Sequence, residues 1–236
     1  MIDYSIIIPC YNESGNLTKL LEGFNDFIMD LNAELILVNN GSKDSTSSMK
    51  TDLLRKYSFL KWVSVEENIG YGNGIYQGIL NAEGKYLVYT HADLQTDPHD
   101  VYSAILISEK NKENSFFLKG VRGGRSIIAR IFSRGMEYVV NLILGVKLKE
   151  INSQPTLFSR ELINNIANPP IHWGFDLCLY YHAIKNSYCI HRIEVQFPKR
   201  QEGKSKWNRG FLSRINLSIK MIKYCLEIKR DENNKP

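Results

Sequence analysis

The chain has 236 residues, and the 43% that are hydrophobic can fill the core of one large domain or two small ones. Its 30 Lys and Arg against 25 Asp and Glu give a formal charge of +5, which suits anionic substrates or a membrane surface but does not demand nucleic acid. The 4 cysteines are widely spaced without a CxxC pair, which argues against a zinc ribbon and against a disulfide framework. We therefore expect one compact unit with reduced thiols.

The N-terminus carries no pattern that directs export. Its apolar run is too short for the hydrophobic region of a signal peptide, and no basic segment precedes it. A membrane-spanning helix needs about 18 apolar residues, and Lys220 and Lys223 interrupt the most hydrophobic late segment. The sequence thus predicts a cytoplasmic protein, or one bound peripherally to the cytoplasmic face of a membrane.

The first half alternates short apolar runs with amphipathic ones. The runs predict strands at residues 4–9, 33–40, 60–66 and 85–93, each followed by a helix at 13–31, 43–57, 70–82 and 98–110. This alternation is typical of strand–helix units that feed a largely parallel sheet. The first half therefore predicts an open α/β fold.

The second half is less regular. It predicts a strand at 116–125, a long helix at 126–145, a short strand and helix within 151–166, a helix at 173–186, a strand at 188–200 and a closing amphipathic helix at 207–230. Residues 231–236 are expected to be a frayed tail.

Four loops after the first four strands are rich in glycine and short polar residues. They read "PCYNESGN", "NNGSKDST", "ENIGYGNG" and "HADLQTDP". Ligands of open α/β sheets collect at the carboxyl ends of the strands, so these loops are expected to carry the chemistry. Any one of them alone would be an ordinary solvated turn.

The order of these pieces resembles family 2 of the inverting glycosyltransferases, and within it the dolichyl-phosphate mannose synthase-like branch. The resemblance rests on "IIIPCYNESGNL", "ILVNNGSKDST", "ENIGYGNGIYQGILNAEGKYLVYTHADLQTDP", "KGVRGGR", "INSQPTLFSREL" and "FPKRQEGKSKW". It implies a GT-A fold, with a largely parallel central sheet flanked by helices. Residues 1–206 would form the transferase domain, 207–230 a helix packed on the domain or at a membrane surface, and 231–236 a tail.

The resemblance also implies a pocket for a UDP- or GDP-sugar. Its first loop would use Pro9, Tyr11 and Glu13, with Glu13 as a ribose or base acceptor. Glu13 is equally well explained as a first-turn carboxylate that complements a helix dipole. Asn39 and Asn40 stand where relatives usually have two aspartates; an amide offers an acceptor and donors but no charge, which leaves the base undefined.

The glycines of "GYGNG" have two readings. Gly70 and Gly74 at a helix start would let the backbone approach a bound phosphate, whose charge the N–H groups favour. The alternative is a tight strand-to-helix turn without a ligand.

"HADLQTDP" occupies the place of the metal-binding motif of the family, usually Asp-x-Asp followed by glutamine. Asp93 and Gln95 match it, and His91 takes the first acidic position. The resemblance implies a divalent metal held by Asp93, His91 and Gln95, and the imidazole shifts the preference from Mg²⁺ toward Mn²⁺. His91 could instead bind phosphate or pack under the loop. Asp97 fits better as a cap of the next helix.

Basic residues of the second half are candidates for anion binding. Arg122 adjoins a strand end and a glycine pair, and relatives use arginines in this region on the acceptor phosphate. Arg200 and Lys206 would lie in a basic flap that contacts the diphosphate or the acceptor. A solvated basic face is the alternative reading.

The implied chemistry is displacement at the anomeric carbon with inversion, with the metal-bound diphosphate leaving and Asp93 and Arg122 in catalytic positions. A lipid-phosphate nucleophile is already anionic and needs no strong base. A sugar hydroxyl needs a base to remove its proton, and Asp176 stands where related enzymes often place that base. Asp176 could instead stabilise a helix N-terminus.

The predicted function is a hexosyltransferase that moves a sugar from a nucleotide-diphosphate sugar to a polyprenyl phosphate or membrane-linked glycan, in cell-surface polysaccharide or glycolipid synthesis. The alternative is a catalytically silent nucleotide-sugar or glycan binding module, because acidic residues are absent at 39, 40 and 91. A nicotinamide oxidoreductase is disfavoured, since the glycine-rich loop follows the third strand. The sequence leaves the oligomeric state open.

Overall fold

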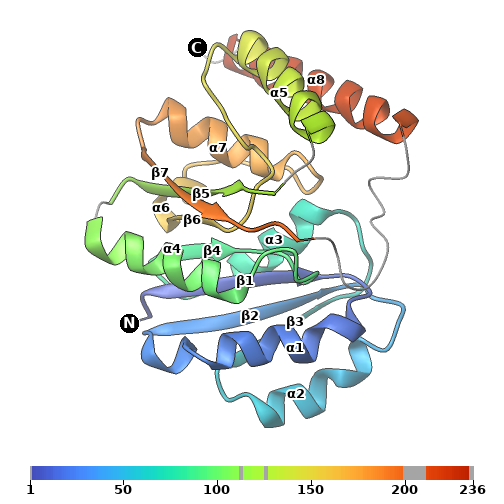
Figure 1. The fold of residues 1–236 in the computed structure, drawn as a ribbon, viewed down its shortest axis with the longest axis vertical. Coiled ribbons are helices and arrows are strands. Elements are labelled where there is room, and N and C mark those ends of the chain that lie inside the picture. The colour runs from blue at the N-terminus through green and yellow to red at the C-terminus, as the bar shows by residue number, and fades with distance from the viewer. Residues whose placement is uncertain (1, 112–113, 125–126, 199–210, 234–236) are drawn as a thin grey trace.

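The computed structural model describes residues 2–111, 114–124, 127–198 and 211–233. Within this part, seven strands form one sheet in the order β3-β2-β1-β4-β6-β5-β7, and helices cover both of its faces (Figure 1). The strands are β1 Tyr4–Cys10, β2 Ala33–Asn40, β3 Leu60–Val65, β4 Tyr86–Tyr89, β5 Phe116–Arg122, β6 Thr156–Ser159 and β7 Cys189–Val195.

Strand direction decides which loops meet. β1 pairs in parallel with β2 and β4, β2 with β3, and β5 with β7, whereas β6 is antiparallel to both β4 and β5. All strands except β6 therefore run the same way. Their carboxyl ends, together with the start of β6, lie along one edge of the sheet, which is where side chains for a ligand site converge.

The helices follow the predicted alternation. They are α1 Ser14–Asn25, α2 Lys50–Lys56, α3 Tyr71–Leu80, α4 Pro98–Asn111, α5 Ile127–Leu144, α6 Arg160–Asn164, α7 Phe175–Lys185 and α8 Phe211–Asn233. Short 3-10 helices occur at Ile28–Asp30 and Ser47–Met49.

Two predicted helices are shorter than expected. The segment 13–31 divides into α1 and a 3-10 turn, because Phe27 leaves the helical backbone conformation with φ −142°. The segment 43–57 begins its α-helix only at Lys50. Its first residues are used for hydrogen bonds to the neighbouring loop, such as the bond from Ser14 N to Asp44 Oδ2, and so leave the helical path.

The core has two layers, one on each face of the sheet. Alternate residues of β1 supply both, since successive side chains of a strand point to opposite faces. Ile6 and Ile8 belong to the layer that includes residues of α1 and α4, while Ile7 belongs to the layer that includes residues of α3, α7 and α8. The buried α8 residues Met221 and Cys225 belong to this second layer, so the C-terminal helix is packed on the domain.

α8 also packs against α5 at the upper end of the molecule (Figure 1). In the part of the chain that the structure describes, no helix combines the length and apolar character needed to cross a bilayer.

Candidate active site

The loops after β1 and β2 are hydrogen-bonded into a single wall. Asn12 N donates to Ser42 Oγ at 3.0 Å, and Lys43 N donates to Asn12 Oδ1 at 2.8 Å. Partial burial raises the pKa of Asp44, but hydrogen bonds from Thr46 and Ser14 outweigh it and leave that pKa below its ordinary value. The wall is therefore held by an ionised carboxylate.

Glu13 occupies the N-cap position of α1. Its side chain makes no cap bond to the helix backbone and accepts a hydrogen bond from Asn16 Nδ2 at 2.7 Å. Tyr11 and Pro9 beside it are half-buried at the end of β1. Contact of these three residues with a nucleotide stays a prediction.

The two asparagines at the end of β2 are both buried but are used differently. Asn39 donates from Nδ2 to Ser47 Oγ at 2.8 Å and accepts from Ser42 N at 3.1 Å, so both ends of its amide serve the loop. Asn40 donates to Gly70 O at 2.9 Å, while its Oδ1 is buried without a hydrogen-bond partner among the described residues. Asn40 thus has an unused acceptor, and a buried acceptor is costly to leave unpaired.

The glycine-rich loop before α3 lies against residues 170–172. A Cβ at Gly70, where φ is +151°, would lie 2.3 Å from Ile171 O, and a Cβ at Gly72 would lie 2.4 Å from Pro170 O. Asn73 N already donates to Ile171 O at 2.7 Å. These glycines serve internal packing, which sequence reasoning could not distinguish from phosphate binding. A ligand role for Gly70 and Gly74 stays a prediction.

Replacing Gly72 with alanine is expected to lower the free energy of unfolding by about 1–3 kcal/mol, the usual cost of overpacking. The new methyl group would meet two backbone carbonyl oxygens that side-chain rotation cannot move. Gly135→Ala in α5 is the control, because no described atom outside the neighbouring helix backbone lies within 4 Å of its added Cβ, and it is expected to raise the free energy of unfolding by up to about 1 kcal/mol. Urea denaturation of both variants measures these changes, and equal stabilities of the two variants would contradict the packing role of Gly72.

The motif after β4 forms a tight turn. Asp93 is only 6% exposed, and its Oδ1 accepts a hydrogen bond from Gln95 N at 3.1 Å. Gln95 Nε2 donates to Pro198 O at 3.1 Å, and binding of a metal by its Oε1 stays a prediction. The ring of half-buried His91 lies 5.7 Å from the ring of Tyr71.

The donor atoms of this turn suit a divalent cation, although they are few. Asp93 supplies a carboxylate, His91 an imidazole and Gln95 an amide oxygen, a set that fits Mn²⁺ or a similar metal with phosphate oxygens completing the shell. In the part of the chain covered by the structure, no three or more His, Cys, Asp or Glu side chains are grouped for a metal. A metal would therefore depend on its nucleotide for part of its ligands.

Asp97 has the capping role that the sequence predicts. Its Oδ1 accepts a hydrogen bond from His99 N at 2.9 Å in the first turn of α4. The prediction is confirmed, and Asp97 is set apart from the metal-binding candidates.

Arg122 at the end of β5 is held from two sides. Its Nε donates to Glu150 Oε2 at 2.8 Å, and its guanidinium lies 5.6 Å from the centre of the Phe197 ring. It forms part of the wall of a cavity of about 170 Å³ between α5 and α8. The other lining residues are the apolar Phe132, Met136, Ile151, Leu217 and Met221 and the polar Ser133, Glu137, Asn152 and Ser218.

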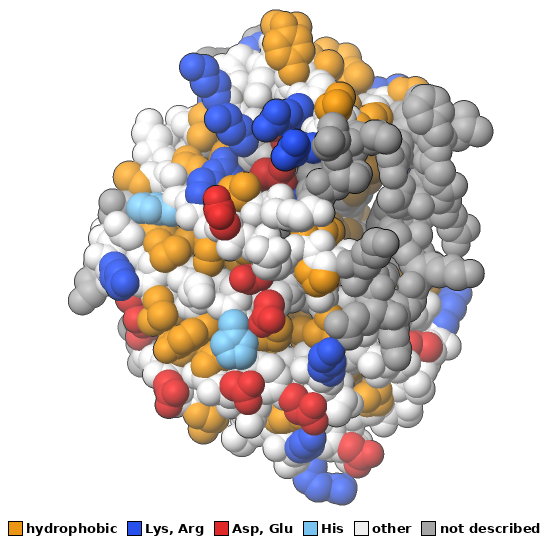
Figure 2. Space-filling view, viewed as in Figure 1, with side chains coloured by type: hydrophobic (Ala, Val, Ile, Leu, Met, Phe, Trp, Pro, Cys, Tyr) orange, Lys and Arg blue, Asp and Glu red, His pale blue; other side chains and the backbone are white. Residues whose placement is uncertain are grey.

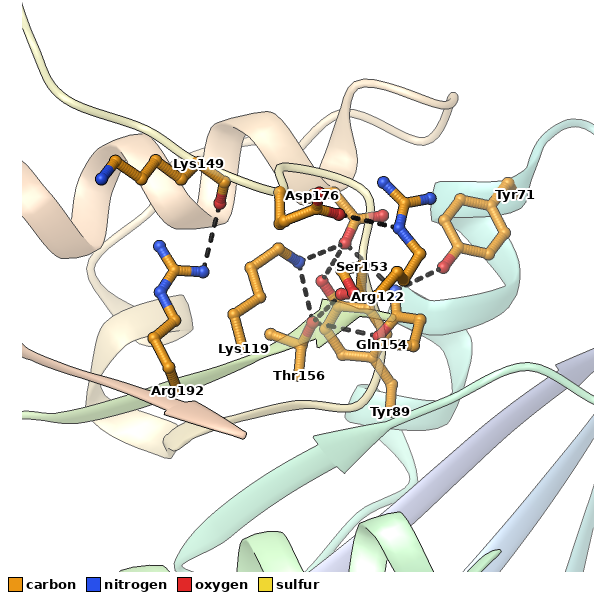
Figure 3. Close-up of polar contacts among 11 residues, drawn as sticks. Tyr71, Tyr89, Lys119, Arg122, Lys149, Ser153, Gln154, Thr156, Asp176 and Arg192 are labelled. Carbon is orange, nitrogen blue, oxygen red and sulfur yellow. Dashed lines mark hydrogen bonds and ion pairs between the residues drawn. The ribbon is translucent and has the colours of Figure 1, made fainter. Parts of the chain in front are cut away.

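Asp176, the candidate base, lies in a buried polar cluster (Figure 3). Its Oδ1 accepts hydrogen bonds from Lys119 Nζ at 2.9 Å, Tyr89 OH at 2.8 Å and Gln154 Nε2 at 3.1 Å. The sheet register explains the cluster, because Thr156 of β6 stands opposite both Tyr89 and Lys119. Burial lowers the pKa of Lys119, and the Asp176 carboxylate opposes that shift.

Sequence reasoning missed four residues of this region: Tyr71, Lys119, Glu150 and Gln154. One signal was available, since Lys119 interrupts the apolar strand "FFLKG". A charge in a buried strand requires a partner. Arg200 and Lys206, predicted for the basic flap, lie outside the described residues.

Comparisons with known proteins agree with this geometry. Residues 5–162 match the family described as "Glycosyl transferase family 2". The chain is 27% identical to dolichyl-phosphate beta-glucosyltransferase of Dictyostelium discoideum, over 95% of this chain and 73% of that protein. It is 26% identical to dolichol-phosphate mannosyltransferase of Pyrococcus furiosus, over 86% of this chain and 58% of that protein.

A similar solved structure is glucosyl-3-phosphoglycerate synthase of Mycobacterium tuberculosis, in complex with Mn²⁺, uridine-diphosphate and glucosyl-3-phosphoglycerate. The TM-score is 0.70 at 17% identity, over 95% of this chain and 78% of that chain. The likeness concerns the fold. It confirms the predicted GT-A arrangement of a central sheet flanked by helices.

Proposed function

Because the chain belongs to glycosyl transferase family 2, we propose that it transfers a sugar from a nucleotide-diphosphate sugar to a polyprenyl phosphate, with inversion at the anomeric carbon. The observation that carries the proposal is Arg122, which pairs with Glu150, in the wall of a cavity between α5 and α8 that is lined in part by apolar side chains. A cation beside apolar side chains suits an acceptor with a phosphate head and a hydrocarbon chain. The names of the two relatives, which both act on dolichyl or dolichol phosphate, support the same class.

The donor site is proposed at the carboxyl ends of β1, β2 and β4. Asp93, His91 and Gln95 would hold the divalent cation, and Asn40 Oδ1 would accept a hydrogen bond from the base or ribose. A bound Mn²⁺ or Mg²⁺ supplies Lewis-acid stabilisation of the departing diphosphate. The choice between UDP and GDP is left to the test below.

The state of Asp176 favours a phosphate nucleophile over a sugar hydroxyl. Three donors, one of them the Lys119 ammonium, already hold Asp176 Oδ1. An oxygen that already accepts three internal hydrogen bonds has its lone pairs occupied and is not available to a substrate hydroxyl. A phosphate monoester is anionic at neutral pH and can attack without a strong base, and Arg122 would orient it. The proposed reaction therefore leaves Asp176 without a proton-transfer step.

The face formed by α5 and α8 is proposed to contact an anionic membrane, on the cytoplasmic side. On α5, Ile131, Tyr138 and Leu142 are 65%, 70% and 73% exposed, and the neighbouring Arg130 and Arg134 are exposed as well. Figure 2 shows hydrophobic and basic side chains close together at this upper end of the molecule. Exposed apolar residues flanked by basic ones suit an interfacial helix.

Ile131→Ser combined with Leu142→Ser is expected to weaken binding to vesicles of anionic lipid by at least about 10-fold, because each buried aliphatic side chain contributes about 1.5–3 kcal/mol. Co-sedimentation measures the effect. Met29→Ser with Leu80→Ser removes two exposed apolar side chains from other elements and serves as the control. Equal binding of both double variants would contradict this membrane face.

The activity is tested by incubating the full chain with UDP- and GDP-sugars, Mn²⁺ and either a polyprenyl phosphate or the matching polyprenol. Transfer to the phosphate alone supports the proposal. Transfer to the polyprenol instead would show that a hydroxyl is the nucleophile and would overturn the argument from Asp176. Donor binding without transfer or hydrolysis would point to a silent binding module.

A further inference from the structure

The buried cluster around Asp176 continues beyond the carboxylate toward the donor site. Lys119 is fully buried, and its Nζ donates to Asp176 Oδ1 and Thr156 Oγ1, both at 2.9 Å. Thr156 Oγ1 also bonds Gln154 Oε1 at 3.0 Å. A buried charge with these partners is rigid, because any movement would leave it unpaired.

The amide of Gln154 is fixed at both ends. Its Oε1 is held by Thr156, while its Nε2 donates to Asp176 Oδ1 and to Tyr71 OH, the latter at 3.2 Å. Gln154 is only 1% exposed, so water does not compete for these bonds. The Tyr71 hydroxyl is thereby tied to the ion pair through one amide group (Figure 3).

Tyr71 itself lies between the two parts of the donor site. It follows Gly70, whose carbonyl accepts from Asn40, and its ring packs 5.7 Å from the His91 ring. Its hydroxyl accepts the hydrogen bond from Gln154 Nε2, so the far end of the ring is held by the cluster. Any rotation of Tyr71 would move a group in contact with the metal-binding motif.

We propose that the Lys119–Asp176 ion pair is a positioning device for the donor site, which acts through Gln154 to hold Tyr71 against His91. Tyr71, Gln154, Asp176 and Lys119 are then positioning residues. The proposal rests on the proposed function for its effect on donor binding. The contact between Tyr71 and His91 can be tested without it.

Tyr71→Phe removes the hydroxyl and keeps the ring, and Tyr57→Phe is the matched control because the Tyr57 hydroxyl is buried without a hydrogen-bond partner in the described part of the chain. In proton NMR spectra, with His91 assigned from a His91→Gln variant, Tyr71→Phe is expected to shift the His91 ring signals and to leave those of His99 in place. Titration with UDP and GDP in Mn²⁺ is expected to give an affinity about 10-fold weaker, the usual effect of losing a supporting contact. Tyr57→Phe is expected to change neither the His91 ring signals nor the nucleotide affinity.

Unchanged His91 signals together with unchanged nucleotide affinity in Tyr71→Phe would overturn the positioning role and leave the proposed function standing. Shifted His91 signals in a protein that binds no nucleotide would support the positioning of His91 and overturn the proposed function instead. Should Tyr71→Phe fail to fold, Gln154→Met provides the second variant, since it removes the amide and keeps the side-chain length. The His91 ring signals and the nucleotide affinity of Gln154→Met are then measured in the same way.

Discussion

Asp93→Asn is expected to lower kcat/KM for sugar transfer by roughly 100-fold or more, the scale of losing one charge-stabilising group at a reacting centre. Asp93 is the acidic residue of the proposed metal site, and it is buried at the turn where β4 ends. An amide keeps the shape and the acceptor for Gln95 N but removes the charge that attracts a cation. The measurement is initial-rate kinetics with Mn²⁺ and whichever UDP- or GDP-sugar proves to be the donor, alongside calorimetric titration of Mn²⁺ with nucleotide.

Asp97→Asn provides the matched control for Asp93→Asn. Asp97 lies four residues further on, is exposed, and accepts a backbone hydrogen bond from His99 as a cap. Asparagine caps helices about as well as aspartate, so stability and kinetics are expected to stay close to those of the unaltered protein. Equal losses in both variants, or none in Asp93→Asn, would show that the turn after β4 does not hold a metal.

Lys119→Met is expected to lower the free energy of unfolding by about 3–5 kcal/mol. The substitution leaves the Asp176 carboxylate buried beside Tyr89 and Gln154 without its cation, and desolvation of an unpaired charge dominates the cost. Adding Asp176→Leu removes the orphaned charge and is expected to recover much of the loss. Urea denaturation of the two single variants and the double variant measures the coupling between these residues.

Lys185→Met is the control for the buried pair. Lys185 forms an ion pair with Glu232 at 3.1 Å, but the two side chains are 48% and 26% exposed. Water and salt screen such a pair, so the expected loss is at most about 1 kcal/mol. A Lys119→Met variant no less stable than Lys185→Met would contradict the account of Lys119 as a paired buried charge.

Much of the first half of the fold could be predicted from the sequence. Runs such as "YSIIIP" and "AELILVNN" are apolar because strands of a parallel sheet are covered on both faces, and each is followed by an amphipathic segment. The antiparallel insertion of β6 between β4 and β5 was beyond such reasoning. Strand order and direction depend on which distant segments pair, and the four residues of β6 carry no sign of their partners.

The parts of the candidate site that consist of residues close together in the sequence could be predicted. The Asp97 cap follows from its position before Pro98, and His91, Asp93 and Gln95 lie in one turn because they are adjacent in sequence. The glycines of "GYGNG" were ambiguous, since a missing side chain can make room for a ligand or for another loop. Only the three-dimensional structure shows Ile171 and Pro170 against Gly70 and Gly72.

The packing of α8 on the domain limits where the chain can be truncated. Tyr224 of α8 packs edge-on against the His172 ring at 5.1 Å, and the neighbouring Ile171 carbonyl meets Gly70 and Asn73 at the start of α3. The last helix thus supports a loop that packs on the start of α3, about 150 positions earlier in the chain and beside the proposed donor site. We expect a protein cut before Phe211 to lose nucleotide affinity as well as part of the surface proposed to contact lipid, so both functions would depend on the same C-terminal helix.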